Sequence, residues 1–188
     1  MADGFLAGWR SARQLQRAAA SYVTALLEEP SAEDVAWLAS CATAGDDDRA
    51  RWELRYVRRA IGLLVAERES VSDRTAQAVA HALGDALDSD RHVGKGMTGL
   101  VERQFNARLR YYTDALASRA DATPAAERLG RALLLTAGAM RVPDDDRQRA
   151  ADVAARYLDE ASERLRTAFG VAALPDDVPP SAAHLPGA

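Results

Sequence analysis

The chain has 188 residues, a length typical of one domain and sufficient for a buried core. Hydrophobic residues make up 48% and charged residues 28%, a composition too apolar for a disordered protein. Acidic and basic residues are interspersed and the formal net charge is −4, so the chain lacks the positive field that nucleic-acid binding needs.

The residue types favour helices over strands. Alanine, the best helix former, dominates the apolar residues, whereas the aromatic residues typical of strands make up only 6%. No apolar run approaches the roughly 20 residues of a membrane span, so no membrane association is expected. Cys41 is the single cysteine, and the N-terminus lacks the pattern of a secretory signal, so we expect a cytoplasmic location.

Periodic apolar positions predict the first two helices. The first is expected over about residues 10–28, with one apolar face, and Pro30 ends it. Ser31 followed by Asp34 is typical of the capped start of a short second helix. Gly45 is expected to end that helix.

The third predicted helix, residues 49–69, has the most informative pattern. Aspartates at 46–48 are suited to stabilise its exposed amide groups and the positive end of its dipole. Two apolar stripes lie about 150° apart on it; they consist of Leu54, Val57, Ile61, Leu64 and Val65, and of Trp52, Tyr56, Ala60 and Leu63. The strip expected to stay polar carries Arg51, Arg55, Arg58 and Gly62. A helix that is apolar on most sides is typically central.

Four more helices are predicted from their start signals. Ser72 or Asp73 opens the fourth helix and Thr98 caps the fifth. The sixth helix is expected over residues 124–140, with proline in its first position and Pro143 after its end. Aspartates at 144–146 open an amphipathic seventh helix that runs to about residue 169.

The sixth predicted helix carries several leucines and two glycines, Gly130 and Gly138. Leucines on several sides indicate burial, and glycine permits close approach of two backbones. Together the elements predict an all-α, single-domain bundle of about seven helices. We assign residues 1–8 to an N-terminal arm, 9–170 to the bundle and 171–188 to a flexible, disordered tail that is rich in proline.

Arginines on the third predicted helix are the first candidate site. Spacings of four and three residues put Arg51, Arg55 and Arg58 on one face, with Arg59 beside it. These arginines could bind an anionic ligand or an acidic partner. The alternative is that these arginines form salt bridges with the surrounding acidic residues.

The glycine-rich segment 88–99 is the second candidate site, because it places His92 and Lys95 just before a helix start. Backbone amides at a helix N-terminus together with a lysine can hold a phosphate or carboxylate. The full phosphate-loop motif and its preceding strand are absent from the sequence. The alternative is a plain connection between two helices.

Other chemistry finds little support in the sequence. There is no Glu-x-x-His pair of the di-iron type, so no metal is expected, although Glu53 and Glu67 lie near the apolar side of the third helix. His81 is expected in solvent, and Cys41 is expected to act as a small core residue. No nucleophile-elbow motif is present, no catalytic residue is identified and no cofactor is implied.

Two functions remain after these exclusions. The first is a non-catalytic protein-interaction or self-association module, with Phe5 and Trp9 near the N-terminus and the amphipathic last helix as candidate surfaces. The alternative is a bundle that binds a small anionic or apolar ligand between its central helices, as a binding protein or as an enzyme. Its polar lining would come from Arg55, Arg59, Gln104, Asn106 or the glycine-rich segment.

Overall fold

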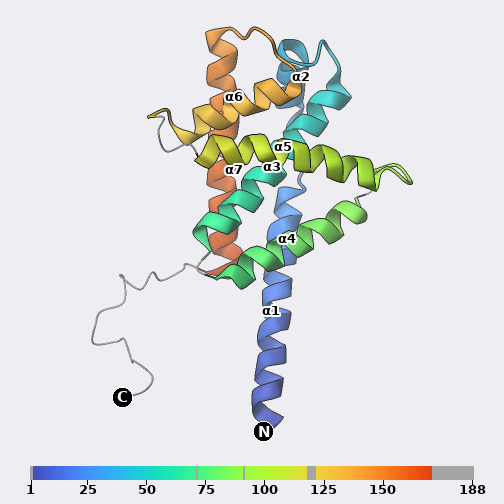
Figure 1. The fold of residues 1–188 in the computed structure, drawn as a ribbon, viewed down its shortest axis with the longest axis vertical. Helices are drawn as coiled ribbons and strands as arrows, with labels where there is room; N and C mark the ends of the chain where they lie inside the picture. The colour runs from blue at the N-terminus through green and yellow to red at the C-terminus, as the bar shows by residue number, and fades with distance from the viewer. Residues whose placement is uncertain (1, 71, 91, 118–121, 171–188) are drawn as a thin grey trace.

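The computed structural model describes residues 2–70, 72–90, 92–117 and 122–170, with side chains from residue 10 onward. The described residues form seven α-helices and no strand, which confirms the all-α prediction (Figure 1). The helices are α1 (Ala2–Leu26), α2 (Ala32–Cys41), α3 (Asp47–Glu69), α4 (Asp73–Asp88), α5 (Thr98–Ala117), α6 (Ala125–Ala137) and α7 (Asp144–Phe169). The predicted tail, 171–188, lies outside the described residues.

Helix α3 is the centre of the bundle and contacts the other six described helices. Its two predicted apolar stripes are buried, apart from a partly exposed Trp52. The predicted exposure of the polar strip is wrong, since Arg55 and Gly62 are buried as well. The Tyr22 hydroxyl of α1 donates a hydrogen bond to the Gly62 carbonyl at 2.8 Å, and a Cβ at Gly62 would overlap the Leu26 side chain. The strip therefore faces α1 and the neighbouring links instead of water.

Local capping signals behave as the sequence predicts. The Ser31 hydroxyl accepts a hydrogen bond from the Asp34 amide at 3.1 Å, and the Asp46 carboxylate accepts one from the Arg49 amide at 2.9 Å. Both bonds satisfy amide groups that have no partner within the helix. The predicted inward face of α7 is also buried.

Three helix boundaries differ from the prediction. Helix α1 begins at Ala2 instead of about residue 10, and α2 ends at Cys41, before Gly45. Helix α6 ends at Ala137, because Gly138 adopts φ +101° and its amide bonds back to the Leu134 and Leu135 carbonyls. This left-handed residue turns the chain out of the helix well before Pro143.

Helices α6 and α7 form the most extensive helix pair of the bundle. Gly130 makes this possible, since a Cβ at that position would lie 2.6 Å from the Ala151 backbone nitrogen and 2.7 Å from the Ala150 carbonyl carbon. The close backbone approach predicted at Gly130 is confirmed.

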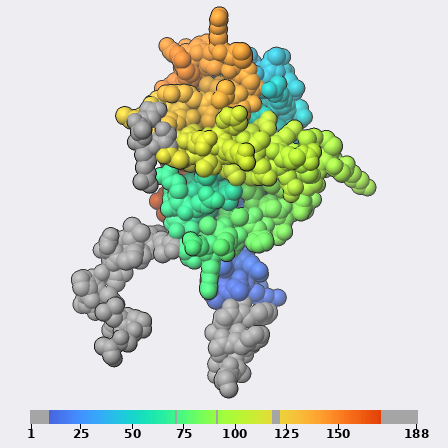
Figure 2. Space-filling model, viewed as in Figure 1, coloured from blue at the N-terminus to red at the C-terminus, as the bar shows by residue number. Residues whose placement is uncertain are grey.

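Among the described side chains of α1, only those in its second half belong to the core. Buried residues begin at Ala19 and continue with Tyr22, Val23 and Leu26, while no side chain in 10–18 is buried. The first half of the helix projects beyond the rest of the bundle, and Figure 2 shows the described side chains of α1 leaving the lower edge of the body. None of the described helices combines the length and the apolar character needed to cross a bilayer.

Candidate functional site

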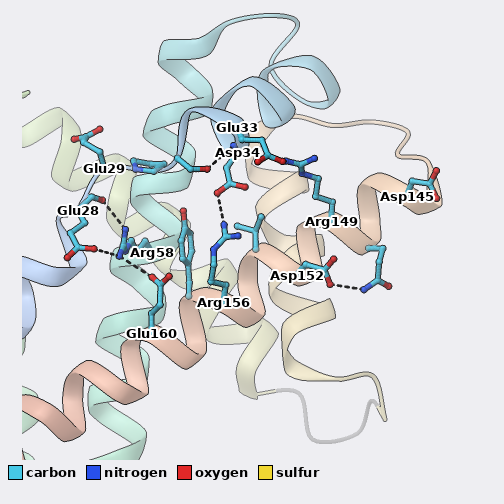
Figure 3. A pocket seen from close by; sticks show the side chains of 15 residues that line it. Glu28, Glu29, Glu33, Asp34, Arg58, Asp145, Arg149, Asp152, Arg156 and Glu160 are labelled. Carbon is cyan, nitrogen blue, oxygen red and sulfur yellow. Dashed lines mark hydrogen bonds and ion pairs between the residues drawn. The ribbon is translucent and has the colours of Figure 1, made fainter.

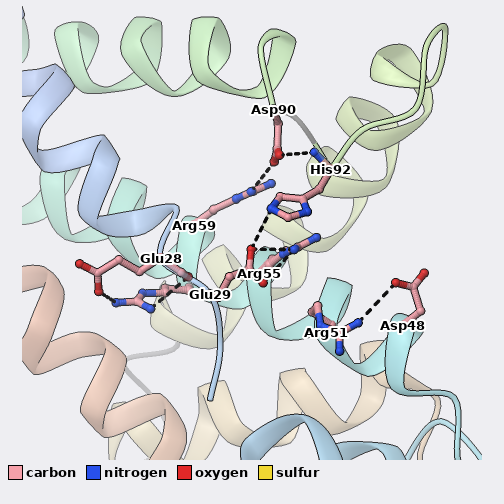
Figure 4. Close-up of polar contacts among 9 residues, drawn as sticks. Glu28, Glu29, Asp48, Arg51, Arg55, Arg59, Asp90 and His92 are labelled. Atoms are coloured by element: carbon pink, nitrogen blue, oxygen red, sulfur yellow. Dashed lines mark hydrogen bonds and ion pairs between the residues drawn. The ribbon is translucent and has the colours of Figure 1, made fainter. Parts of the chain in front are cut away.

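One hollow gathers predicted residues from three segments of the chain (Figure 4). It encloses about 420 Å³ between the first turns of α3, the link from α1 to α2 and the link from α4 to α5. We call it the arginine pocket; its lining residues are Glu29, Asp48, Arg51, Trp52, Arg55 and His92.

Arg55 is the buried cation of the arginine pocket, with a side chain only 5% exposed. Its Nη2 donates to both Glu29 carboxylate oxygens, at 2.7 and 2.8 Å, and its guanidinium carbon lies 4.7 Å from the centre of the Trp52 ring. His92 Nε2 lies 3.3 Å from the same Glu29 carboxylate. Arg55 Nε is buried and has no hydrogen-bond partner among the described residues. The pocket therefore already holds one carboxylate, from Glu29.

Arg59 lies one turn further along α3 and is 2% exposed. Its Nη2 donates to Asp90 Oδ2 at 2.8 Å, and Asp90 Oδ1 accepts the His92 amide at 2.9 Å. Burial lowers the pKa of Arg59. Burial by itself would raise the pKa of Asp90, but the His92 amide and the Arg59 guanidinium outweigh it and hold that pKa below its ordinary value. Asp90 thus ties the link that carries His92 to the central helix.

The structure brings together three of the five predicted site residues. Arg55, Arg59 and His92 lie around Glu29 and Asp90 (Figure 4), whereas Arg58 lies in a different hollow. Lys95 is exposed in a turn and lines neither hollow. The predicted salt bridges are confirmed, because each of the three arginines has a carboxylate partner. Anion binding stays a prediction.

A larger hollow of about 800 Å³ lies between α2, α7 and the link from α1 to α2 (Figure 3). We call it the acidic groove, because seven of its lining residues are acidic and three are arginines. The acidic residues are Glu28, Glu29, Glu33, Asp34, Asp145, Asp152 and Glu160. Arg58 bridges Glu28 and Glu160 at 2.9 and 3.1 Å, while Arg149 and Arg156 pair with Glu33 and Asp34. The groove keeps an excess of negative charge after this pairing.

Tyr157 forms part of the wall of the acidic groove. The guanidinium carbons of Arg58 and Arg156 lie 5.4 and 5.6 Å from its ring centre, and its buried hydroxyl has no hydrogen-bond partner among the described residues. Burial, aided by the Asp34 charge, raises the pKa of Tyr157 to about 12. The phenol is therefore neutral at physiological pH.

A third hollow, the α1–α4 groove, encloses about 890 Å³. Its apolar lining residues are Ala12, Leu15, Ala20, Val23 and Leu27 on α1 and the link after it, and Ala78, Ala82 and Ala86 on α4. Its polar lining residues are Gln16, Thr24, Arg74, Gln77, His81, Asp85 and Ser89. The groove begins at Ala12, which lies in the unburied half of α1. It therefore runs from the core out onto the projecting part of the helix.

Glu53 shows that an inward carboxylate on α3 is structural. It is 1% exposed, and Arg108 of α5 holds it through two bonds, Nε to Oε2 at 2.6 Å and Nη2 to Oε1. The hydrogen bonds to Glu53 raise the pKa of Arg108. Glu67, the other inward candidate, is exposed. Among the described residues no group of three or more His, Cys, Asp or Glu side chains is placed to hold a metal ion.

Cys41 is half-buried at the end of α2. Burial, aided by the Asp146 charge, raises the pKa of its thiol to about 11. Since the thiolate is the nucleophilic form, Cys41 is a poor nucleophile at neutral pH.

Sequence reasoning missed Glu29, which belongs to the arginine pocket and to the acidic groove. Glu29 lies 26 positions from Arg55, and no local pattern links the two. Gln104, named as a lining residue, instead accepts a hydrogen bond from the Tyr56 hydroxyl, and Asn106 is exposed. No protein-family model, curated protein or solved structure matches the chain.

Proposed function

We propose that the protein is a non-catalytic self-association module, in which α1 of each copy lies in the α1–α4 groove of the other. The observation that carries the proposal is that no side chain in segment 10–18 of α1 is buried. We place this association in the cytoplasm, since a single cysteine suits a reducing compartment.

A projecting amphipathic helix needs a partner surface. In folded proteins a helix gains most of its stability from packing an apolar face, and short isolated helices are marginal in water. Helix α1 runs without a break from Ala2 to Leu26, yet its neighbours in the bundle leave the described segment 10–18 without a buried side chain. A second molecule can supply the missing packing.

The sequence of the projecting half continues the apolar lining of the groove. Phe5 precedes Val23, and Trp9 precedes Leu27, by 18 positions, which is roughly five complete turns. Val23 and Leu27 both line the α1–α4 groove. In a continuous helical register, the sequence positions of Phe5 and Trp9 therefore repeat those of Val23 and Leu27.

A second copy of the chain suits this geometry. The groove and the projecting half lie along one side of the same helix, so a two-fold axis across α1 brings each projecting half to the groove of the other copy at once. Such an isologous contact closes on itself and stops at a dimer. Arg10 and Arg17 are exposed and fall far around the helix from Ala12, on the side that stays in water.

Sedimentation equilibrium over about 1 to 100 μM protein tests the proposal, since a dissociation constant in this range is typical of a modest interface. We expect the mean mass to rise from that of the monomer toward that of the dimer. Ala12→Glu puts a charge into the groove and should raise the dissociation constant roughly tenfold or more.

Gln14→Glu is the matched control, because Gln14 is also exposed but lies on the opposite side of α1. It should leave the dissociation constant within about twofold. A wild-type protein that stays monomeric throughout, or a dimer that responds equally to both variants, contradicts the proposal.

A further inference from the structure

We propose that the arginine pocket binds a small carboxylate, and that Glu29 is an internal carboxylate which the ligand displaces. This inference is independent of self-association, since the pocket lies on α3 and two links and not on the α1–α4 groove.

The pocket is already built to receive a carboxylate. Arg55 donates to both oxygens of Glu29, and His92 Nε2 lies 3.3 Å from one of them. The Trp52 ring lies 4.7 Å from the Arg55 guanidinium, a distance at which the ring face attracts and orients a cation. A planar anion at the position of the Glu29 carboxylate meets the same partners.

Glu29 is easier to displace than Asp90, the buried carboxylate that pairs with Arg59. It lies in the link between α1 and α2, and its side chain is 45% exposed, whereas the Asp90 side chain that pairs with Arg59 is 7% exposed. Glu29 also lines the acidic groove, so its side chain borders a second, open hollow. Because the Glu29 side of this pair is exposed, water can solvate the Glu29 carboxylate once it leaves Arg55, and a competing anion can replace it.

A ligand carboxylate can use a donor that Glu29 leaves unpaired. Arg55 holds Glu29 through Nη2 alone, and its buried Nε has no partner among the described residues. A carboxylate that approaches side-on accepts from Nε and Nη2 together, which is the stronger two-bond arrangement for this pair of groups. It would also satisfy a buried donor, which is unfavourable to leave without a hydrogen bond.

The charge of the pocket favours the exchange. With Glu29 in place, the lining arginines Arg51 and Arg55 face two carboxylates, Glu29 and Asp48. When Glu29 leaves, the pocket has one uncompensated positive charge beside His92. A small carboxylate such as acetate neutralises this charge, and it is small enough to fit in the 420 Å³ pocket.

The test is a titration of the full chain with sodium acetate, followed by NMR of the Arg55 Nε–H and Trp52 indole N–H signals. A parallel titration with sodium chloride at equal ionic strength corrects for salt. We expect saturable shifts of both signals with acetate and not with chloride. If neither signal shows a saturable shift with acetate, the titration of the wild-type protein alone overturns the proposal.

Two neighbouring variants then test the role of Glu29. Glu29→Gln removes the internal competitor and should tighten acetate binding about fivefold. Glu28→Gln is the matched control, since Glu28 is 52% exposed and pairs with Arg58 in the acidic groove; it should change the affinity by less than about twofold. An affinity that Glu29→Gln does not raise, or that both variants raise equally, shows that Glu29 does not occupy the site.

Discussion

Arg59 is the largest of the fully buried side chains, and one carboxylate balances its charge. Moving two charges out of water has a high energetic cost, which the pair offsets only while both partners are present. Asp90 has a second role, because it also accepts the His92 amide and so holds the link from α4 to α5 against α3. The pair therefore couples the stability of the fold to the position of a pocket residue.

We predict that Asp90→Asn lowers the free energy of unfolding by about 3 kcal/mol at pH 7, because it leaves the buried Arg59 charge unpaired. Because Arg59 and the His92 amide hold the folded pKa of Asp90 below its ordinary value, its stabilising effect is present at neutral pH. The effect is lost as the pH falls through that lowered pKa. Urea denaturation at pH 7 and at about pH 3 measures the free energy of unfolding of the wild-type and Asp90→Asn proteins. The difference between the two values should be smaller at about pH 3 than at pH 7.

Asp88→Asn provides the comparison for this experiment. Asp88 is exposed at the end of α4, so its loss should change the free energy of unfolding by less than about 0.5 kcal/mol. Equal effects of the two substitutions, or a difference that persists unchanged in acid, would show that the Arg59–Asp90 pair is not responsible.

At the scale of the helices, Gly130 sets the distance between α6 and α7. The backbone of Ala150 and Ala151 lies where a Cβ at Gly130 would be, so any side chain there forces the helices apart. Rigid backbone atoms cannot yield as a flexible side chain can. Helix α7 can pack closely against α6 because residue 130 has no side chain.

We predict that Gly130→Ala lowers the free energy of unfolding by roughly 1–3 kcal/mol through overpacking, despite the better helix propensity of alanine. The control is Gly84→Ala on α4, where nothing lies within 4 Å of the added Cβ. That substitution should stabilise the protein by about 0.5–1 kcal/mol. Urea denaturation of the two variants decides the matter, and a stabilised Gly130→Ala protein would refute the close-packing argument.

At the scale of the whole molecule, the bundle surrounds α3 on many sides but covers only part of α1. Local stability is lowest where few apolar contacts protect the backbone hydrogen bonds. The unburied segment 10–18 meets this description in a single copy of the chain. Dimerisation through the α1–α4 groove would bury it.

We predict that amide hydrogen exchange in residues 10–18 becomes concentration-dependent. When the protein concentration rises from well below to well above the dissociation constant, exchange there should slow at least about tenfold. Amides of α3 should exchange at a rate that does not depend on concentration, because the monomer already buries that helix. Protection of 10–18 that is the same at every concentration would mean that α1 needs no partner.

Much of the fold was predictable because its signals are local. The caps at Ser31 and Asp46 depend on residues within one turn. The apolar pattern of α3 and the glycine at position 130 are likewise visible within one helix, although the surfaces they pack against come from other helices. Two of the three wrongly predicted helix boundaries are in α6 and α1. Gly138 ends α6 early by adopting a left-handed conformation, and α1 continues toward the N-terminus beyond its predicted start.

The candidate site was only partly predictable. The sequence indicated Arg55, Arg59 and His92 as residues that bind an anion, and these do lie together. It gave no sign that Glu29 completes the pocket, since Glu29 and Arg55 are 26 positions apart and meet only because α1 crosses α3.

By itself, the sequence determined the helical class, the order of the helices and which face of most of them is apolar, because residue type, spacing and capping act over one or two turns. Only the tertiary structure decided that Arg55 and Arg59 of α3 are buried, that Arg58 is separated from them, and that residues 10–18 of α1 are left uncovered. Those outcomes depend on where one helix crosses another, and the crossing is set by the packing of side chains from distant parts of the chain.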